Sequence, residues 1–153
     1  MITSISSIAH RSLLAAVAIA SALPGAAFAT PVVTTESTVF VERAAEGNAR
    51  ALEPARSFKR GDRVVTILRW HRLGGDGGFT ITNPLPRAIA YQASSAHEEE
   101  VSVDGGKTWG ALESLRVGKR YATVEDVTHV RWRVSPGRSK KGSGQFAFSG
   151  IVR

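Results

Sequence analysis

Residues 102–109 (Ser-Val-Asp-Gly-Gly-Lys-Thr-Trp) form a turn motif between two strand-like runs, and this motif is the strongest constraint on the fold of the chain. The carboxylate of Asp104 is placed to accept hydrogen bonds from backbone N–H groups across the turn. The glycines that follow it adopt positive φ without steric cost, and Trp109 can pack back over the hairpin. We therefore expect a structural turn carried by Ser102, Asp104, Gly106, Thr108 and Trp109.

Alternating apolar and polar residues indicate strands along most of the chain. In residues 128–135, for example, Val130, Trp132 and Val134 would share one face, whereas Arg131 and Arg133 point to the other. Clusters of Gly, Pro, Asn and Asp separate such runs at intervals of roughly ten residues, which is typical of an antiparallel β-sandwich with about seven or eight strands. We therefore predict an all-β fold in which two antiparallel sheets enclose one core.

The chain contains no cysteine, so its stability must come from a hydrophobic core and not from disulfides. The alternation predicts that this core consists of Phe40, Val64, Leu68, Trp70, Phe79, Ile81, Tyr91, Val101, Val103, Val130, Trp132, Phe146 and Phe148.

The N-terminus has the pattern of a secretory signal peptide. Basic residues at 10–11 precede an apolar run over residues 13–23, and a small-x-small site ends at Ala29. The apolar run is shorter than the ~20 residues that span a bilayer. We therefore expect cleavage after Ala29 and export to the periplasm, the cell surface or the medium, with no transmembrane segment in the mature chain. The alternative is a retained membrane anchor.

Residues 30–37 lack alternation and contain Pro31, so we expect a flexible N-terminal leader there. The predicted division is thus a signal peptide at 1–29, a leader at 30–37 and one domain at 38–153. We found no internal repeat.

Several turn and strand signals occur in a characteristic order: Gly-Asp at 61–62, Thr-Asn-Pro-Leu-Pro at 82–86, Val-Ser-Val-Asp-Gly-Gly at 101–106, Val-Arg-Trp at 130–132, and Pro-Gly at 136–137. This order resembles the immunoglobulin-like repeat of unknown function found in bacterial surface and secreted proteins, here as a single copy over roughly residues 38–153. The resemblance implies an immunoglobulin-like antiparallel sandwich and supplies no catalytic residues.

The turn at 102–109 also resembles an Asp-box, which occurs on the outside of sialidase-like propellers. A propeller needs several blades of about 40–50 residues each, and this chain is too short for them. We therefore interpret the motif as a structural hairpin turn.

The sequence does not predict an enzyme. It has no Gly-x-Ser-x-Gly nucleophile turn, and the acidic residues 98–100 lack a positioned partner for glycoside hydrolysis, so we expect them in a solvated loop. Without cysteine, His71 and His129 do not make a complete zinc ligand set. We therefore predict no catalytic residues, no metal and no cofactor.

Binding remains as the predicted function. The formal net charge is +7, but no nucleic-acid-binding motif accompanies it, so nucleic acid is not an expected partner. We predict a structural, adhesive or protein-interaction module whose partner is a protein or a surface polymer. The alternative is a module that binds a carbohydrate or a polyanion such as an acidic glycan. The candidate ligand-binding residues are Trp109, His129, Arg131, Arg133, Lys140 and Lys141.

Overall fold

A computed structural model describes residues 31–44, 49–96 and 98–153, and within them the chain is all-β as predicted. The expected signal peptide lies outside the described residues. The strands are β1 (Val32–Ala44), β2 (Arg50–Pro54), β3 (Arg63–Gly74), β4 (Phe79–Pro84), β5 (Ile89–Ser94), β6 (Glu99–Ser102), β7 (Arg116–Val117), β8 (Arg120–Tyr121), β9 (His129–Val134) and β10 (Ser143–Val152). The helical elements are the 3-10 turns η2 (Leu112–Ser114) and η3 (Val124–Asp126) and the short α1 (Pro136–Ser139).

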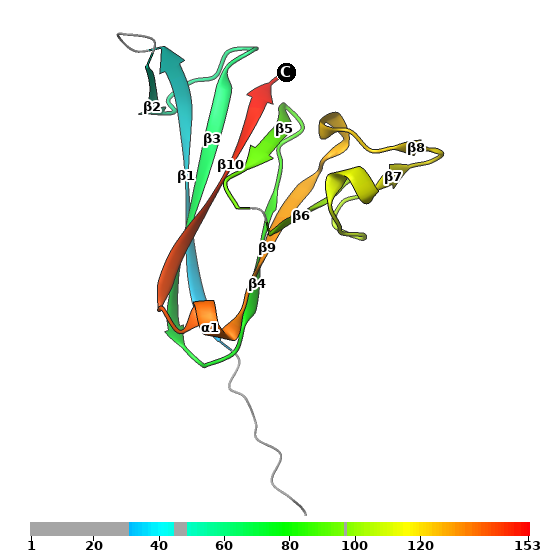
Figure 1. Cartoon of the computed structure of the whole chain (residues 1–153). Coiled ribbons are helices and arrows are strands. Elements are labelled where there is room, and N and C mark those ends of the chain that lie inside the picture. Colours follow the sequence, from blue (N-terminus) through cyan, green and yellow to red (C-terminus); the bar gives the residue numbers. More distant parts are fainter. Residues whose placement is uncertain (1–30, 45–48, 97) are drawn as a thin grey trace, which may run out of the picture.

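Two antiparallel sheets make up the body of the molecule (Figure 1). The large sheet has five strands in the order β2-β1-β3-β10-β5, and the small sheet has three in the order β4-β9-β6. The sheets meet at the bottom of Figure 1, where α1, the β3–β4 turn and the start of β1 lie, and they diverge toward the C-terminus. We call these the closed end and the open end. The β7–β8 hairpin projects beside β6.

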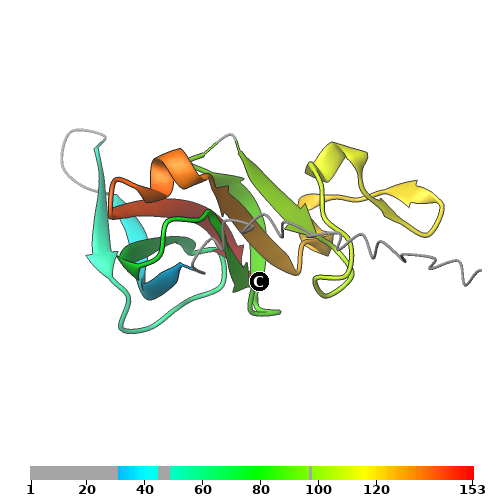
Figure 2. The same cartoon turned by 90° about the horizontal axis from the view of Figure 1, so that it is seen from below.

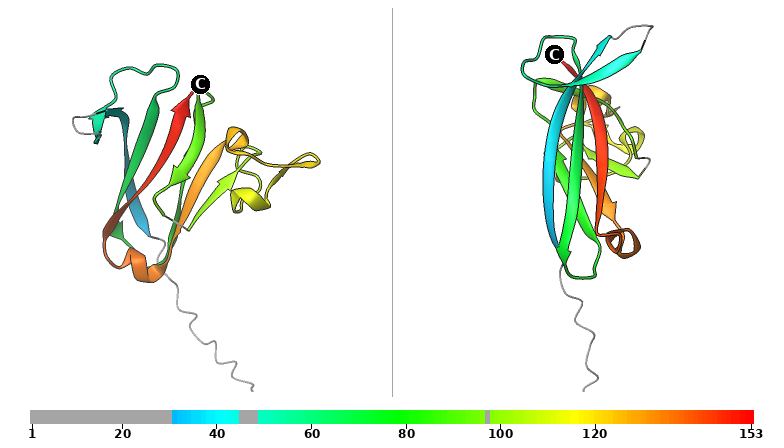
Figure 3. Two further views of the ribbon diagram at one scale, coloured as in Figure 1. Left: turned by 45° about the horizontal axis from the view of Figure 1, so that its top comes forward. Right: turned by 90° about the vertical axis from the view of Figure 1, so that its left-hand side faces the viewer.

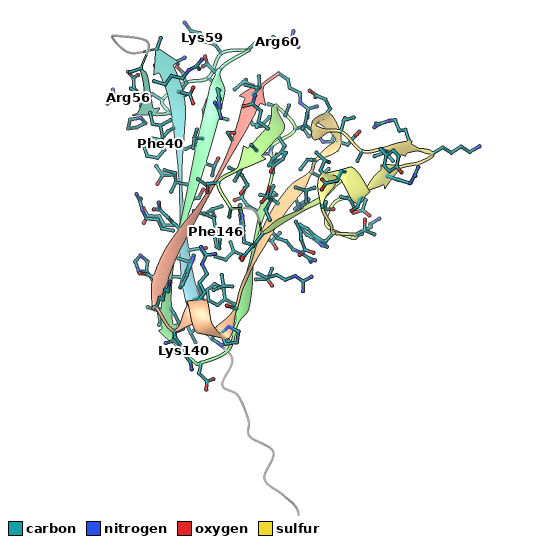
Figure 4. The ribbon with its side chains drawn as sticks, in the orientation of Figure 1. Phe40, Arg56, Lys59, Arg60, Lys140 and Phe146 are labelled. Atoms are coloured by element: carbon teal, nitrogen blue, oxygen red, sulfur yellow. The ribbon has the colours of Figure 1, made fainter. Side chains whose placement is uncertain are left out.

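The core lies between the two sheets and is built from aromatic pairs. Trp132 of β9 stacks on Phe146 of β10, with ring centres 5.0 Å apart and planes 9° apart. Trp70 of β3 meets Phe79 of β4 edge-on at 5.2 Å. Figure 4 shows Phe146 pointing into the space between the sheets. These residues were predicted in the core, and all four belong to it, with Phe79 only partly buried.

Phe40 was predicted in the core, and this prediction is wrong. It pairs with Val65 on one side and with Pro54 on the other, and it faces away from the small sheet. Its neighbour Val41 takes the inward position and is only 2% exposed. Since side chains alternate along a strand, assigning Phe40 to the core inverted the faces of β1. Sequence reasoning also missed the buried residues Leu85 and Val127.

The predicted flexible leader is also wrong, because residues 32–37 belong to β1. They pair antiparallel with β3 in register from Gly74 to Leu68, so the folded domain starts at Val32 or earlier and not at residue 38. Pro31 precedes the strand and does not interrupt it. Residues 32–35 are all β-branched and thus favour a strand, and β3 offers a long edge on which they pair. Figure 3 shows β1, β3 and β10 side by side along the large sheet.

Residues 136–144 fold into α1 and the turn that leads to β10. Pro136 occupies the start of the helix, and the Ser135 hydroxyl accepts a hydrogen bond from the N–H of Arg138. Ser139 is fully buried. The N–H of Arg72 donates to the carbonyl of Gly142 at 2.7 Å, which joins this turn to the end of β3.

Candidate functional site

Both carboxylate oxygens of Asp104 accept hydrogen bonds from groups within the turn at residues 102–109. Oδ1 accepts from the N–H groups of Lys107 and Thr108 at 3.0 and 2.9 Å and from the Ser102 hydroxyl at 2.8 Å. Oδ2 accepts from the Thr108 hydroxyl at 2.7 Å. These bonds, led by that of the Thr108 backbone, hold the pKa of Asp104 far below its ordinary value. The carboxylate is therefore engaged within the turn, which does not suit it to acid–base chemistry.

Trp109 is held against the turn and the small sheet. Its indole N–H donates to the carbonyl of Gly106 at 2.8 Å. The guanidinium carbon of Arg131 lies 4.3 Å from the ring centre, and the ring of His129 approaches edge-on at 6.2 Å. One face of the indole is thus covered by a cation, and the residue as a whole is only partly exposed.

Arg131 and Arg133 project from the outer face of β9 and share one carboxylate. Their Nε groups donate to the same Glu100 oxygen at 2.8 and 2.9 Å. These two bonds, that of Arg131 first, lower the pKa of Glu100 to about 2. The solvated loop expected at residues 98–100 is therefore wrong for its last two members, which belong to β6, because Glu100 lies opposite Arg131 in the register.

Glu99 points to the other side of β6, toward the core. The hydroxyl of Tyr91 on β5 donates to Glu99 Oε1 at 3.2 Å, across the edges of the two sheets. Burial, together with the nearby carboxylate, raises the pKa of Tyr91 above its ordinary value. The contact therefore joins a neutral phenol to the carboxylate and ties β6 to the large sheet.

The basic candidate residues extend from Trp109 toward the closed end, and Arg131 and Arg133 among them share the Glu100 carboxylate. His129 and Arg131 lie near Trp109, whereas Lys140 lies at the closed end beyond α1 (Figure 4). Arg133 and Lys141 line a shallow pocket of about 540 Å³, together with Arg138 and Glu98.

Sequence reasoning missed Arg138, which sits at this pocket. Its guanidinium carbon lies 4.4 Å from the ring centre of Phe146, and its Nη1 lies 3.8 Å from the exposed carboxylate of Glu98. The only sequence signal was its position in a short basic segment among Gly and Ser.

The small sheet has no strand opposite β1 among the described residues. Thr35 and Ser37 pair with Trp70 and Leu68 of β3, so all four side chains share the inner face of the large sheet. Trp70 and Leu68 are 0% and 4% exposed, yet Thr35 and Ser37 are exposed. The inner face of β1 is therefore uncovered where β3 beside it is buried.

An apolar groove of about 390 Å³ lies beside the uncovered inner face of β1. Its walls include Ser37 and Val39 of β1, Phe148 of β10, Pro84 at the end of β4, and the half-exposed Phe58. The opposite side of the molecule differs, because there Val101 of β6 bridges to Gly110 and residues 103–128 cover the edge of the small sheet. The two sheets are thus open on the β1–β4 side.

No group of three His, Asp or Glu side chains that could hold a metal occurs within the described ranges. Nor does any helix there have the length and apolarity needed to cross a bilayer. Comparisons of the chain with family models, with curated proteins and with solved structures found no match.

Proposed function

We propose that this protein is an exported, non-enzymatic interaction module with an immunoglobulin-like sandwich, and that it binds an extended strand of a partner protein beside β4. The observation that carries the proposal is the uncovered inner face of β1, with exposed Thr35 and Ser37 beside fully buried Trp70. A strand added at β4 would lie opposite β1 and fill the apolar groove.

The edge of β4 suits such pairing. Within the described residues, β4 pairs only with β9, so its other edge carries unpaired backbone N–H and C=O groups. Residues 79–84 (Phe-Thr-Ile-Thr-Asn-Pro) contain no charge that would repel a partner strand. In strand addition, backbone bonds supply affinity and pockets for alternate side chains supply specificity. The partner is therefore an extended segment with apolar residues at every second position.

The immunoglobulin-like assignment and export rest on the sequence. The order of turn signals from Gly61 to Gly137 supports the former, and the N-terminal pattern ending at Ala29 supports the latter. Two opposed antiparallel sheets are compatible with the proposed sandwich. The non-enzymatic role is supported by the engagement of Asp104 in its turn and of Glu100 with two arginines.

The alternative, a carbohydrate-binding module centred on Trp109, has weaker support. The indole N–H is bonded to Gly106, and Arg131 covers one ring face. Binding to a glycan array that is lost in the Trp109→Ala variant would support this alternative.

The groove can be tested with a synthetic capped peptide of alternating Val and Thr, using the full chain. We expect binding that Ser37→Lys abolishes, since the new side chain would enter the groove with a buried charge. The matched control is Thr34→Lys, which adds the same charge to an exposed position on the other face of β1. If both variants bind the peptide as the unmodified protein does, or if the unmodified protein does not bind, the proposal is wrong.

Amide hydrogen exchange separates strand addition from simple occupation of the groove. Peptide binding should slow exchange at amides of residues 79–83 that do not already pair with β9. Binding without new protection in β4 would contradict strand addition. Export is tested independently, by sequencing the N-terminus of the protein recovered from the envelope or the medium, where we expect Thr30 as the first residue.

A further inference from the structure

The closed end exposes two large apolar side chains, Leu73 and Val32. Leu73, at the end of β3, is 68% exposed, the highest value for a large hydrophobic residue in the described part of the chain. Val32, at the start of β1, is 57% exposed, and it pairs with Gly74 next to Leu73. Two neighbouring strand ends therefore present apolar side chains to solvent at one place.

Basic residues lie on the turn next to the end of β3. The bond from the Arg72 N–H to the Gly142 carbonyl places the turn that carries Lys140 and Lys141 beside the end of β3. Neither lysine forms an ion pair with any described residue. Arg138 on α1 differs from them, because it lies over the Phe146 ring and 3.8 Å from the Glu98 carboxylate. Figure 2 views the molecule from this end.

The closed end also carries some negative charge. Asp76 is exposed in the β3–β4 turn, and Glu98 lies at the pocket that Arg138 and Lys141 line. Arg72, at the end of β3, is another cation there, so positive charge predominates over these two carboxylates.

We propose that the closed end docks on a membrane surface that contains anionic lipids. Leu73 and Val32 would enter the interface between headgroups, and Lys140 and Lys141 would contact lipid phosphates. Amphiphilic surfaces bind membranes through this combination of buried apolar area and attraction to anionic headgroups.

A lipid surface explains the apolar residues, which an acidic polysaccharide would leave in water.

The β7–β8 hairpin provides a matched control, because it also combines exposed apolar and basic residues. Tyr121 is 59% exposed, but the guanidinium carbon of Arg116 lies 4.0 Å from its ring centre. Arg120 is paired with Asp126 at 2.6 Å. Lys119 is the only other cation of this hairpin, and it forms no ion pair with a described residue.

The test is co-sedimentation of the mature chain, residues 30–153, with phosphatidylcholine vesicles that contain about one-third phosphatidylglycerol. We expect binding that falls about five-fold for each of Lys140→Ser and Lys141→Ser, and about five-fold for Leu73→Ser because the leucine side chain no longer enters the interface. The hairpin variants Lys119→Ser and Tyr121→Ser should bind as the unmodified protein does. Because the apolar run at residues 13–23 is left out, binding reports on the folded domain.

Three results would overturn the proposal. The first is that the unmodified mature chain binds pure phosphatidylcholine as well as it binds the anionic vesicles, or binds neither. The second is that the hairpin variants lose as much binding as those at the closed end. The third is that binding depends on the lysines but not on Leu73, which would indicate a polyanion site and not a membrane site. Circular dichroism of each variant confirms that lost binding is not lost folding.

Discussion

Gly144 of β10 lies against the buried indole of Trp70, and this contact gives the sharpest test of how the two central strands of the large sheet pack. A Cβ at residue 144 would lie 2.6 Å from Cζ2, 2.8 Å from Cε2 and 2.9 Å from Nε1 of Trp70. Trp70 is 0% exposed and packs edge-on against Phe79, so its ring has no free space into which to move. We therefore expect Gly144→Ala to force a shift of the indole or of β10.

The size of the effect follows from the overlap. Separations of 2.6–2.9 Å are well inside ordinary carbon–carbon contact, and inserting a methyl group into a packed core costs about 1–3 kcal/mol. For a domain of this size, each kcal/mol corresponds to a fall in melting temperature of about 4 °C. Gly144→Ala should therefore lower the melting temperature by about 4–12 °C.

The assay is thermal unfolding of the full chain followed by circular dichroism. Gly137→Ala is the matched control, because nothing lies within 4 Å of a Cβ at that position and its φ is not positive. We expect the control to unfold at the temperature of the unmodified protein or slightly above it, since alanine favours the helix that contains residue 137. If both variants melted at the same temperature, the packing of Trp70 on β10 would be refuted.

Three further outcomes are expected. Asp104→Ala should lower the melting temperature at neutral pH. Folding depresses the Asp104 pKa, so the carboxylate stabilises the folded protein above the ordinary pKa of 3.8, and this stabilisation is lost as the pH falls below that value. The melting temperatures of the variant and of the unmodified protein should therefore converge in acid. Glu100→Gln should move elution from a heparin column to higher salt, since it removes the carboxylate that two arginines share; unchanged elution would show that those arginines face no polyanion. Phe40→Ala should destabilise the protein by less than the ~3–5 kcal/mol typical of a buried phenylalanine, and by less than Phe146→Ala does in a denaturant titration.

The sequence by itself determined features that depend on neighbours along the chain. The alternation along β9 predicted that Val130, Trp132 and Val134 are buried, and they are 0%, 0% and 2% exposed. The turn predicted at residues 102–109 also forms, with Asp104 accepting hydrogen bonds from Ser102 and Thr108. Such features are local, because strand geometry sets the spacing of side chains on each face.

The tertiary structure alone decided the features that depend on pairing between distant segments. Residues 32–37 became a strand because β3 offers an edge to them, and Phe40 faces outward because this register places Val41 inside. Glu100 meets Arg131 only through the register of β6 on β9.

The groove and the closed end belong to the same class of feature. The groove exists because the large sheet extends past the edge of the small one at β1. The closed end brings Leu73 of β3 near Lys141 of the turn before β10, about 70 positions further along the chain. A period-two pattern records which residues share a face of one strand. It does not record which strand lies beside it or how many strands the opposing sheet contains, because those depend on the free energy of the whole packed assembly.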